Sequence, residues 1–371
     1  MLSGFFVLVL NAGALLGQGV RSPQELLKEA VSLHQAGKLD RAIEDYRLFL
    51  DGYPDVVEVR SDLGAALAGA GRYEEAIVEY KRALQLKPIS EVQLNLALAY
   101  YKTAKLPLAV ENLLKVREEM PGDLRPVMLL ADCYLRLGEN KKVIELLGPL
   151  QKKSGDDLAT VYMLGTALVR DGQTDKGQIL IDRILKNGDS AEARLLLGTT
   201  KMMVNDFAGA LADLQRAVEM NPNLPDVYTY YGLALTSTGD QAGGQEAFRR
   251  ALQSDPNNFE ANLRIGVLLR KEEKHDEALQ HFHHALEIRP GDLGVRYQIA
   301  SIELALGQVE GARRHLESIV GEAPNFTEAH VSLATAYYRE KRKADGDRER
   351  AIVEKLNAEK QASEKGVKVA Q

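Results

Sequence analysis

The sequence predicts an all-α protein, a right-handed α-solenoid of stacked helix-turn-helix hairpins. Three observations lead to this fold class. The chain repeats itself with a period of about 34 residues, two columns of small residues recur at that period, and most units close with a proline. Self-similarity of about this length is typical of arrays in which each unit packs only on its neighbours.

Both columns hold mostly alanine or glycine, as expected where two helices of one hairpin cross closely and a larger side chain would push them apart. The first column reads Ala30, Gly64, Ala97, Ala131, Gly165, Gly198, Gly232, Gly266, Ala300 and Ala334. The second column reads Ala42, Ala76, Ala109, Val143, Gly177, Ala210, Gly244, Ala278 and Ala312.

The second unit shows the elements in order. Its first helix is expected over 58–69, where apolar residues recur at helical spacing, and Gly71 then interrupts the pattern. The second helix is expected over 73–86. Pro88 ends it, because proline cannot continue a helix and restricts the residue before it.

This arrangement resembles the tetratricopeptide repeat, whose pattern W-x2-L-G-x2-Y…A-x3-F…P is matched in most columns. The tryptophan column is empty, since the chain has no Trp. The large residue of the second helix is Tyr46, Tyr80, Leu113, Leu147, Ile181, Leu214, Phe248, Phe282 and Leu316. The closing prolines are Pro54, Pro88, Pro121, Pro222, Pro256, Pro290 and Pro324. The resemblance implies that first helices line a concave surface and second helices lie outside.

The chain divides into four expected segments. Residues 1–20 form a signal peptide, and 21–339 hold about nine repeats plus a tenth first helix. A charged capping helix follows over 340–365, and 366–371 form a frayed tail.

Repeats four and five depart from the pattern, because both lack the closing proline. Pro149 instead follows Gly148 inside the second helix of repeat four. A proline there removes a backbone donor, so we expect this helix to end early or kink and the junction over 148–157 to be irregular.

The first twenty residues contain an apolar run without charge over 5–10, and the charged, periodic chain begins at Arg21. We expect a cleaved secretory signal and therefore an exported protein, periplasmic or extracellular, from a bacterial source. The alternative is an uncleaved segment that anchors the chain in a membrane, since the usual Lys or Arg before the apolar run is missing.

The composition excludes several kinds of function. The net charge is −6 with mixed signs, so no basic surface for nucleic acid is expected. Cys133 is the one cysteine and is expected to be a buried small hydrophobe. Neither a phosphate-binding loop nor a nucleophile elbow occurs, so we expect no enzyme and no cofactor. His281 and His284 could share a metal, but no further ligand is evident, and we interpret them as surface residues.

Function is therefore expected in the groove that the resemblance implies. The candidate partner-binding residues are first-helix positions outside the packing columns: Tyr101, Met128, Leu135, Tyr162, Thr166, Met202, Thr229, Arg270, Tyr297 and Tyr338. The tyrosines and Met202 suit an exposed partner surface, whereas aliphatic residues there could equally join adjacent first helices. A carboxylate clamp of lysines and asparagines, as in chaperone-binding relatives, is unsupported.

We expect a non-catalytic scaffold that binds a peptide or protein. The alternative is an accessory subunit of a separate enzyme or of a secretion or assembly complex.

Overall fold

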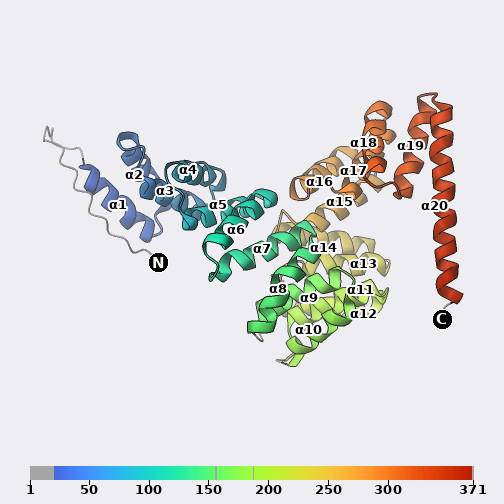
Figure 1. Cartoon of the computed structure of the whole chain (residues 1–371), viewed down its shortest axis with the longest axis horizontal. Helices are drawn as coiled ribbons and strands as arrows, with labels where there is room; N and C mark the ends of the chain where they lie inside the picture. The colour runs from blue at the N-terminus through green and yellow to red at the C-terminus, as the bar shows by residue number, and fades with distance from the viewer. Residues whose placement is uncertain (1–20, 155–156, 187, 370–371) are drawn as a thin grey trace. The chain divides into compact units, whose positions relative to one another are not determined.

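The structure, a computed structural model, describes residues 21–154, 157–186 and 188–369 (Figure 1). Every regular element among these residues is an α-helix, which confirms the predicted all-α class. The expected signal segment 1–20, the end of the expected tail at 370–371 and part of the expected irregular junction, 155–156, lie outside the described residues. Among the helices described, none is both long and apolar enough to cross a membrane.

The chain divides into two compact units. Unit 1 comprises 1–103 together with 118–120, and unit 2 comprises 104–117 and 121–371. The described helices of unit 1 are α1 (Pro23–Gln35), α2 (Leu39–Gly52), α3 (Val57–Gly69), α4 (Tyr73–Leu86) and α5 (Ser90–Lys102).

Unit 2 continues the alternation of first and second helices, beginning with most of α6. Its helices are α6 (Leu106–Glu119), α7 (Leu124–Leu137), α8 (Asn140–Ser154), α9 (Leu158–Arg170), α10 (Thr174–Lys186), α11 (Ala191–Met203), α12 (Phe207–Met220), α13 (Val227–Ser237), α14 (Gln241–Ser254), α15 (Phe259–Lys271), α16 (His275–Ile288), α17 (Leu293–Ala305), α18 (Val309–Glu322), α19 (Thr327–Arg339) and α20 (Lys343–Val369).

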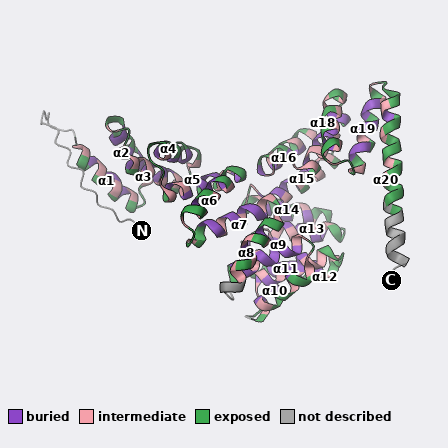
Figure 2. Ribbon diagram, viewed as in Figure 1, coloured by how far each residue is buried: buried purple, intermediate pink, exposed green. Residues whose placement is uncertain are grey.

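The small-residue columns hold the two helices of a hairpin together as predicted. A Cβ atom added to Gly232 would lie 2.7 Å from the ring of Phe248, and one added to Gly266 would lie 2.6 Å from the ring of Phe282. Both rings are almost wholly buried. Figure 2 shows the same division along the array, with buried residues on one side of a helix and exposed residues on the other.

The turn inside each hairpin adopts a left-handed backbone. Six of these turns use glycine, as at Gly71 and Gly138, because glycine reaches positive φ without steric cost. The other four carry a side chain there and so bear some strain. They are Ala104, Asn205, Glu273 and Lys341, with φ between 57° and 62°.

Helix α8, which contains Pro149, does not end at this proline. Helix α8 continues through Pro149 to Ser154, so the prediction that it ends early is wrong. The physical reason lies in the preceding residue. A proline ring usually clashes with the Cβ of the residue before it, and Gly148 has none. Proline still removes one helical hydrogen bond.

The last two helices form a tenth hairpin. Helix α20 covers all but the first three residues of the region expected as a charged capping helix over 340–365, and it continues to Val369, into the segment expected as a frayed tail. A Cβ added to Gly346 would lie 2.6 Å from the ring of Tyr338, so the close crossing of the other repeats is present here too. Cys133 in α7 is fully buried, as expected, and burial raises the pKa of its thiol to about 12.

Candidate functional site

The predicted groove residues are less exposed than a free partner surface would require. Leu135, Thr166 and Thr229 are buried, and the other seven are half-buried. Thr229 is 1% exposed, and its hydroxyl has no hydrogen-bond partner among the described residues. The first helices of unit 2 therefore use several of these positions to pack on one another.

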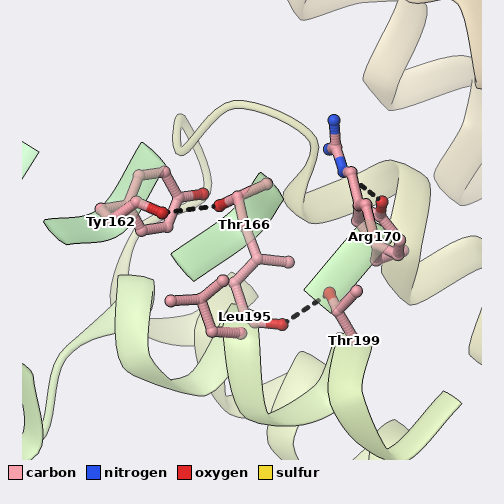
Figure 3. A pocket seen from close by; sticks show the side chains of 7 residues that line it. Tyr162, Thr166, Arg170, Leu195 and Thr199 are labelled. Atoms are coloured by element: carbon pink, nitrogen blue, oxygen red, sulfur yellow. Dashed lines mark hydrogen bonds between the residues drawn. The ribbon is translucent and has the colours of Figure 1, made fainter. Parts of the chain in front are cut away.

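Figure 3 shows this packing where α9 and α11 meet. The hydroxyl of Thr166 donates to the carbonyl of Tyr162 at 2.9 Å, and that of Thr199 donates to the carbonyl of Leu195 at 2.8 Å. The cavity that these residues share with Arg170 has a volume of about 10 Å³. It has room for one water molecule at most, so no peptide enters at this point.

Arg170, the last residue of α9, links two later repeats. Its Nε donates to the hydroxyl of Tyr230 at 2.9 Å, and its Nη2 donates to Asp226 Oδ2 at 2.8 Å. Asn258 donates to the other carboxylate oxygen of Asp226, also at 2.8 Å. One arginine thus joins α9 to the start of α13 and, through Asp226, to the start of α15.

A second arginine makes a similar connection from α7. Arg136 Nη1 donates to Asp255 at 2.7 Å, and its Nε donates to Asp132 within its own helix at 3.2 Å. The backbone carbonyl of Arg136 accepts a hydrogen bond of 2.6 Å from Arg289 Nε. The guanidinium of Arg289 also stacks on Phe259, 3.9 Å from the ring centroid. We call Arg136, Arg170 and Arg289, with the aspartates that contact them, the arginine cluster.

The charges of the arginine cluster are strongly coupled. Burial opposes ionisation of Asp226, but the charge and hydrogen bond of Arg170 outweigh it and hold the pKa of this carboxyl below its ordinary value. The pKa of Arg289 is lowered, mainly by burial and further by the charge of Arg170. Asp226 therefore has an arginine against it, whereas Arg289 has no carboxylate in contact within the described chain.

The lowered pKa of Asp226 predicts an acid-dependent contribution to stability. A depressed carboxyl pKa stabilises the folded state above the ordinary value of about 4, and this contribution disappears as the pH falls through the folded value. We expect Asp226→Asn to unfold at lower temperature than the wild type at pH 7, and the gap to close towards pH 3. Thermal unfolding followed by circular dichroism across this range measures it. A gap that is unchanged at pH 3 would contradict the prediction.

Five of the predicted residues make contacts with groups outside the arginine cluster. Tyr297 packs against Phe326, with ring centroids 5.3 Å apart, and the hydroxyl of Tyr338 donates to Asp347 at 2.8 Å. Tyr101, in unit 1, has the ammonium of Lys102 5.9 Å from its ring centroid. Met202 borders the apolar core around α11 to α13. Met128 is half-buried, with its sulfur 3.8 Å from the hydroxyl of Thr160.

The two histidines considered as metal ligands, His281 and His284, form hydrogen bonds within the protein. His281 Nδ1 lies 2.9 Å from Asn262 Oδ1, and His284 lies 2.9 Å from Glu287 and 3.1 Å from the carbonyl of Pro256. In the part of the chain that the structure describes, no three His, Cys, Asp or Glu residues gather as a metal site would require.

Sequence reasoning missed the arginine cluster and also a column of polar pairs. In each pair a first-helix residue bonds a second-helix residue nineteen positions later. The pairs are Arg60–Glu79, Arg194–Asp213, Asn262–His281 and His330–Glu349. The constant spacing of these pairs could have been recognised in the sequence. Of the three arginines in the cluster, only Arg170 had a sequence signal, a weaker one, which is a single charge at the end of an otherwise apolar first helix.

These observations define the class of protein, a helical repeat array. The model of the tetratricopeptide repeat matches residues 27–90, 162–225 and 232–292, and a second model of the same repeat matches 269–337. The chain belongs to the tetratricopeptide repeat family.

Known proteins resemble this chain over part of its length. It is 27% identical over 106 residues to Protein CTR9 homolog of Arabidopsis thaliana, which covers 28% of this chain and 10% of that protein. It is 24% identical over 162 residues to Anaphase-promoting complex subunit 7 of Homo sapiens, which covers 43% of this chain and 29% of that one. The chain thus spans less than a third of either relative.

Among solved structures, the APC/C hetero-tetramer Cut9-Hcn1 is similar over 90% of this chain and 73% of its own, with a TM-score of 0.59 and 12% identity. At that identity the likeness shows the fold alone. The repeat family and a relative named as a complex subunit support a protein-interaction scaffold with protein partners.

Proposed function

We propose that this chain is a non-catalytic scaffold that binds a protein or peptide along the surface of its first helices. The observation that carries the proposal is the make-up of that surface. Tyrosine, methionine and arginine recur at half-buried first-helix positions, and such side chains contribute strongly to protein interfaces. The alanine and glycine columns are excluded from the interface because they serve the packing of hairpins.

The partner surface is not one open groove in this proposal. Around Tyr162 the space holds one water molecule at most, so a partner contacts the edges of the first helices or displaces side chains there. The half-buried tyrosines Tyr101, Tyr162, Tyr297 and Tyr338 are the proposed anchors, together with Met202 and Arg270.

A second candidate function is that of a subunit in a larger assembly. The similarity to Anaphase-promoting complex subunit 7 favours this alternative. In that case, the partner would be one or more protein chains held permanently, and the array would be recovered from its host mainly as part of a complex.

The test is crosslinking and co-purification of the full chain from its native host, with wild type and the double variant Tyr101→Ala, Tyr162→Ala compared. We expect partner recovery to fall at least about tenfold in the variant, because truncating an interface tyrosine commonly costs over 1 kcal/mol. His283→Ala, at an exposed position of the second helix α16, is the control. Normal recovery of every partner by the double variant would exclude the two tyrosines as anchors.

Export is a separate proposal that rests on the sequence of residues 1–20, with membrane anchoring by an uncleaved segment as its alternative. Mass spectrometry of the mature protein distinguishes them. A chain that retains Met1 would exclude cleavage.

A further inference from the structure

Arg289 is the one member of the arginine cluster that has no carboxylate in contact among the described residues. Arg136 contacts Asp132 and Asp255, and Arg170 contacts Asp226. Arg289 contacts no carboxylate within the described residues. Its one hydrogen bond there runs from Nε to the carbonyl of Arg136, which leaves the two terminal nitrogens without an acceptor.

The guanidinium of Arg289 is nevertheless held in place. Phe259 lies under its plane at 3.9 Å, and the bond from Nε fixes its rotation at 2.6 Å. Phe259 is itself buried, with 6% of its surface exposed, so the stacking surface is rigid. A side chain held by stacking and one hydrogen bond loses little further freedom when it binds a ligand.

Gly138 lies against the guanidinium. A Cβ atom added to it would lie 3.4 Å from Arg289 Nη1, 3.5 Å from Cζ and 3.8 Å from Nη2, so the glycine leaves room for no more than a methyl group at that point. Gly138 also adopts φ of 77°, a conformation that glycine reaches without strain. The end of α7 thus approaches the guanidinium with backbone alone.

The charges around the arginine cluster disfavour a ligand with two negative charges. Its three arginines face Asp132, Asp226 and Asp255, and Glu260 and Asp292 also act on Arg289 by charge without contacting it, so negative charge is already at least equal to positive charge. The groups that still lack a hydrogen-bond acceptor are the terminal N–H groups of the planar Arg289 guanidinium. A carboxylate satisfies them with two parallel hydrogen bonds and adds only one charge, whereas a phosphate at neutral pH adds nearly two.

We propose that Arg289 binds a carboxylate of the partner, an Asp or Glu side chain of an acidic peptide segment, through its two terminal nitrogens. This inference rests on the proposed function and specifies the chemistry of its partner. Phe259 and the carbonyl of Arg136 are positioning groups, because they orient the arginine without touching the ligand.

The test uses the full chain and an array of immobilised twelve-residue peptides with varied sequences and one central Glu. Each peptide is matched by a copy with Gln and a copy with phosphoserine at that position. We expect the wild type to bind a subset of the Glu peptides at least about tenfold more strongly than their Gln copies. Arg289→Ala should abolish that preference, and Arg289→Lys should retain only part of it, because lysine keeps the charge but not the planar fork.

Arg249→Ala is the matched control, since this arginine lies on α14 with 55% of its side chain exposed. It should bind as the wild type does. Circular dichroism establishes that each variant is folded. Equal binding by wild type and Arg289→Ala, whether both bind or neither does, would overturn the inference, and so would stronger binding of the phosphoserine copies. Partner recovery through the tyrosines is measured separately, so either proposal can fail alone.

Discussion

Replacing Phe282 by alanine is expected to lower the free energy of unfolding of unit 2 by about 3–5 kcal/mol. The ring is fully buried and fills the space that Gly266 leaves open in the facing helix. Removing it leaves a cavity between two helices whose positions are fixed by neighbouring repeats, so little collapse is possible. Denaturant unfolding followed by circular dichroism measures the loss.

The adjacent residue supplies the control. His283 lies one position further along α16 and is exposed, so His283→Ala should change stability by no more than about 0.5 kcal/mol. Since each repeat contacts mainly its neighbours, hydrogen exchange should show the loss of protection centred on α15 and α16. A loss below about 1 kcal/mol in Phe282→Ala would mean that the close crossing does not stabilise the array.

The fold could be predicted from sequence because its determinants are local and repeated. Gly266 and Phe282 lie in one hairpin, and the same pair of columns recurs along the chain, so the pattern predicts the crossing without knowledge of distant contacts. The helix end expected at Pro149 was wrong for a reason that is also local, because Gly148 before the proline has no Cβ to clash with the proline ring.

The arginine cluster could not be predicted in the same way. Arg136 bonds Asp255 across 119 positions, and Arg289 bonds Arg136 across 153. No periodic pattern relates these residues, because the contact depends on how several repeats accumulate their rotation. The sequence predicted that Tyr162, Thr166 and Thr229 lie on the first helices. Whether such side chains are exposed or buried against a neighbouring helix depends on the rotation accumulated from repeat to repeat.

The polar pairs between first and second helices could be predicted in part. Their spacing of nineteen residues is periodic, but the burial of their side chains is not evident from the sequence. In repeats four and five the equivalent positions are apolar, with Val127 and Leu146 in one and Val161 and Leu180 in the other. In these two repeats both positions of the pair are therefore apolar together. Where only one position is polar, as with Asp45 opposite Leu26 in the first repeat, the polar residue takes its partner from elsewhere, here from Arg21 at 2.8 Å.

This pairing predicts that His330→Val alone destabilises the last hairpin by about 2–4 kcal/mol, whereas His330→Val combined with Glu349→Leu does so by less than about 1 kcal/mol. His330 is 4% exposed, with Nδ1 2.5 Å from Glu349 and Nε2 3.0 Å from the carbonyl of Pro324. Both ring nitrogens of His330 are thus used in hydrogen bonds. The single change removes the imidazole and leaves the carboxylate of Glu349, 15% exposed, without its partner.

The double variant removes both members of the pair and installs the Val and Leu that repeats four and five already carry, so the carboxylate of Glu349 is not left without its partner. Hydrogen exchange of α19 and α20, read by mass spectrometry, measures the effect where it arises, since a terminal hairpin can open without the rest of the array. Glu354→Gln, an exposed carboxylate on the same helix, is the control and should leave exchange unchanged. Additive losses, with the double variant less stable than either single variant, would contradict the idea that the pair acts as a unit, because the second change would then relieve nothing that the first had left unpaired.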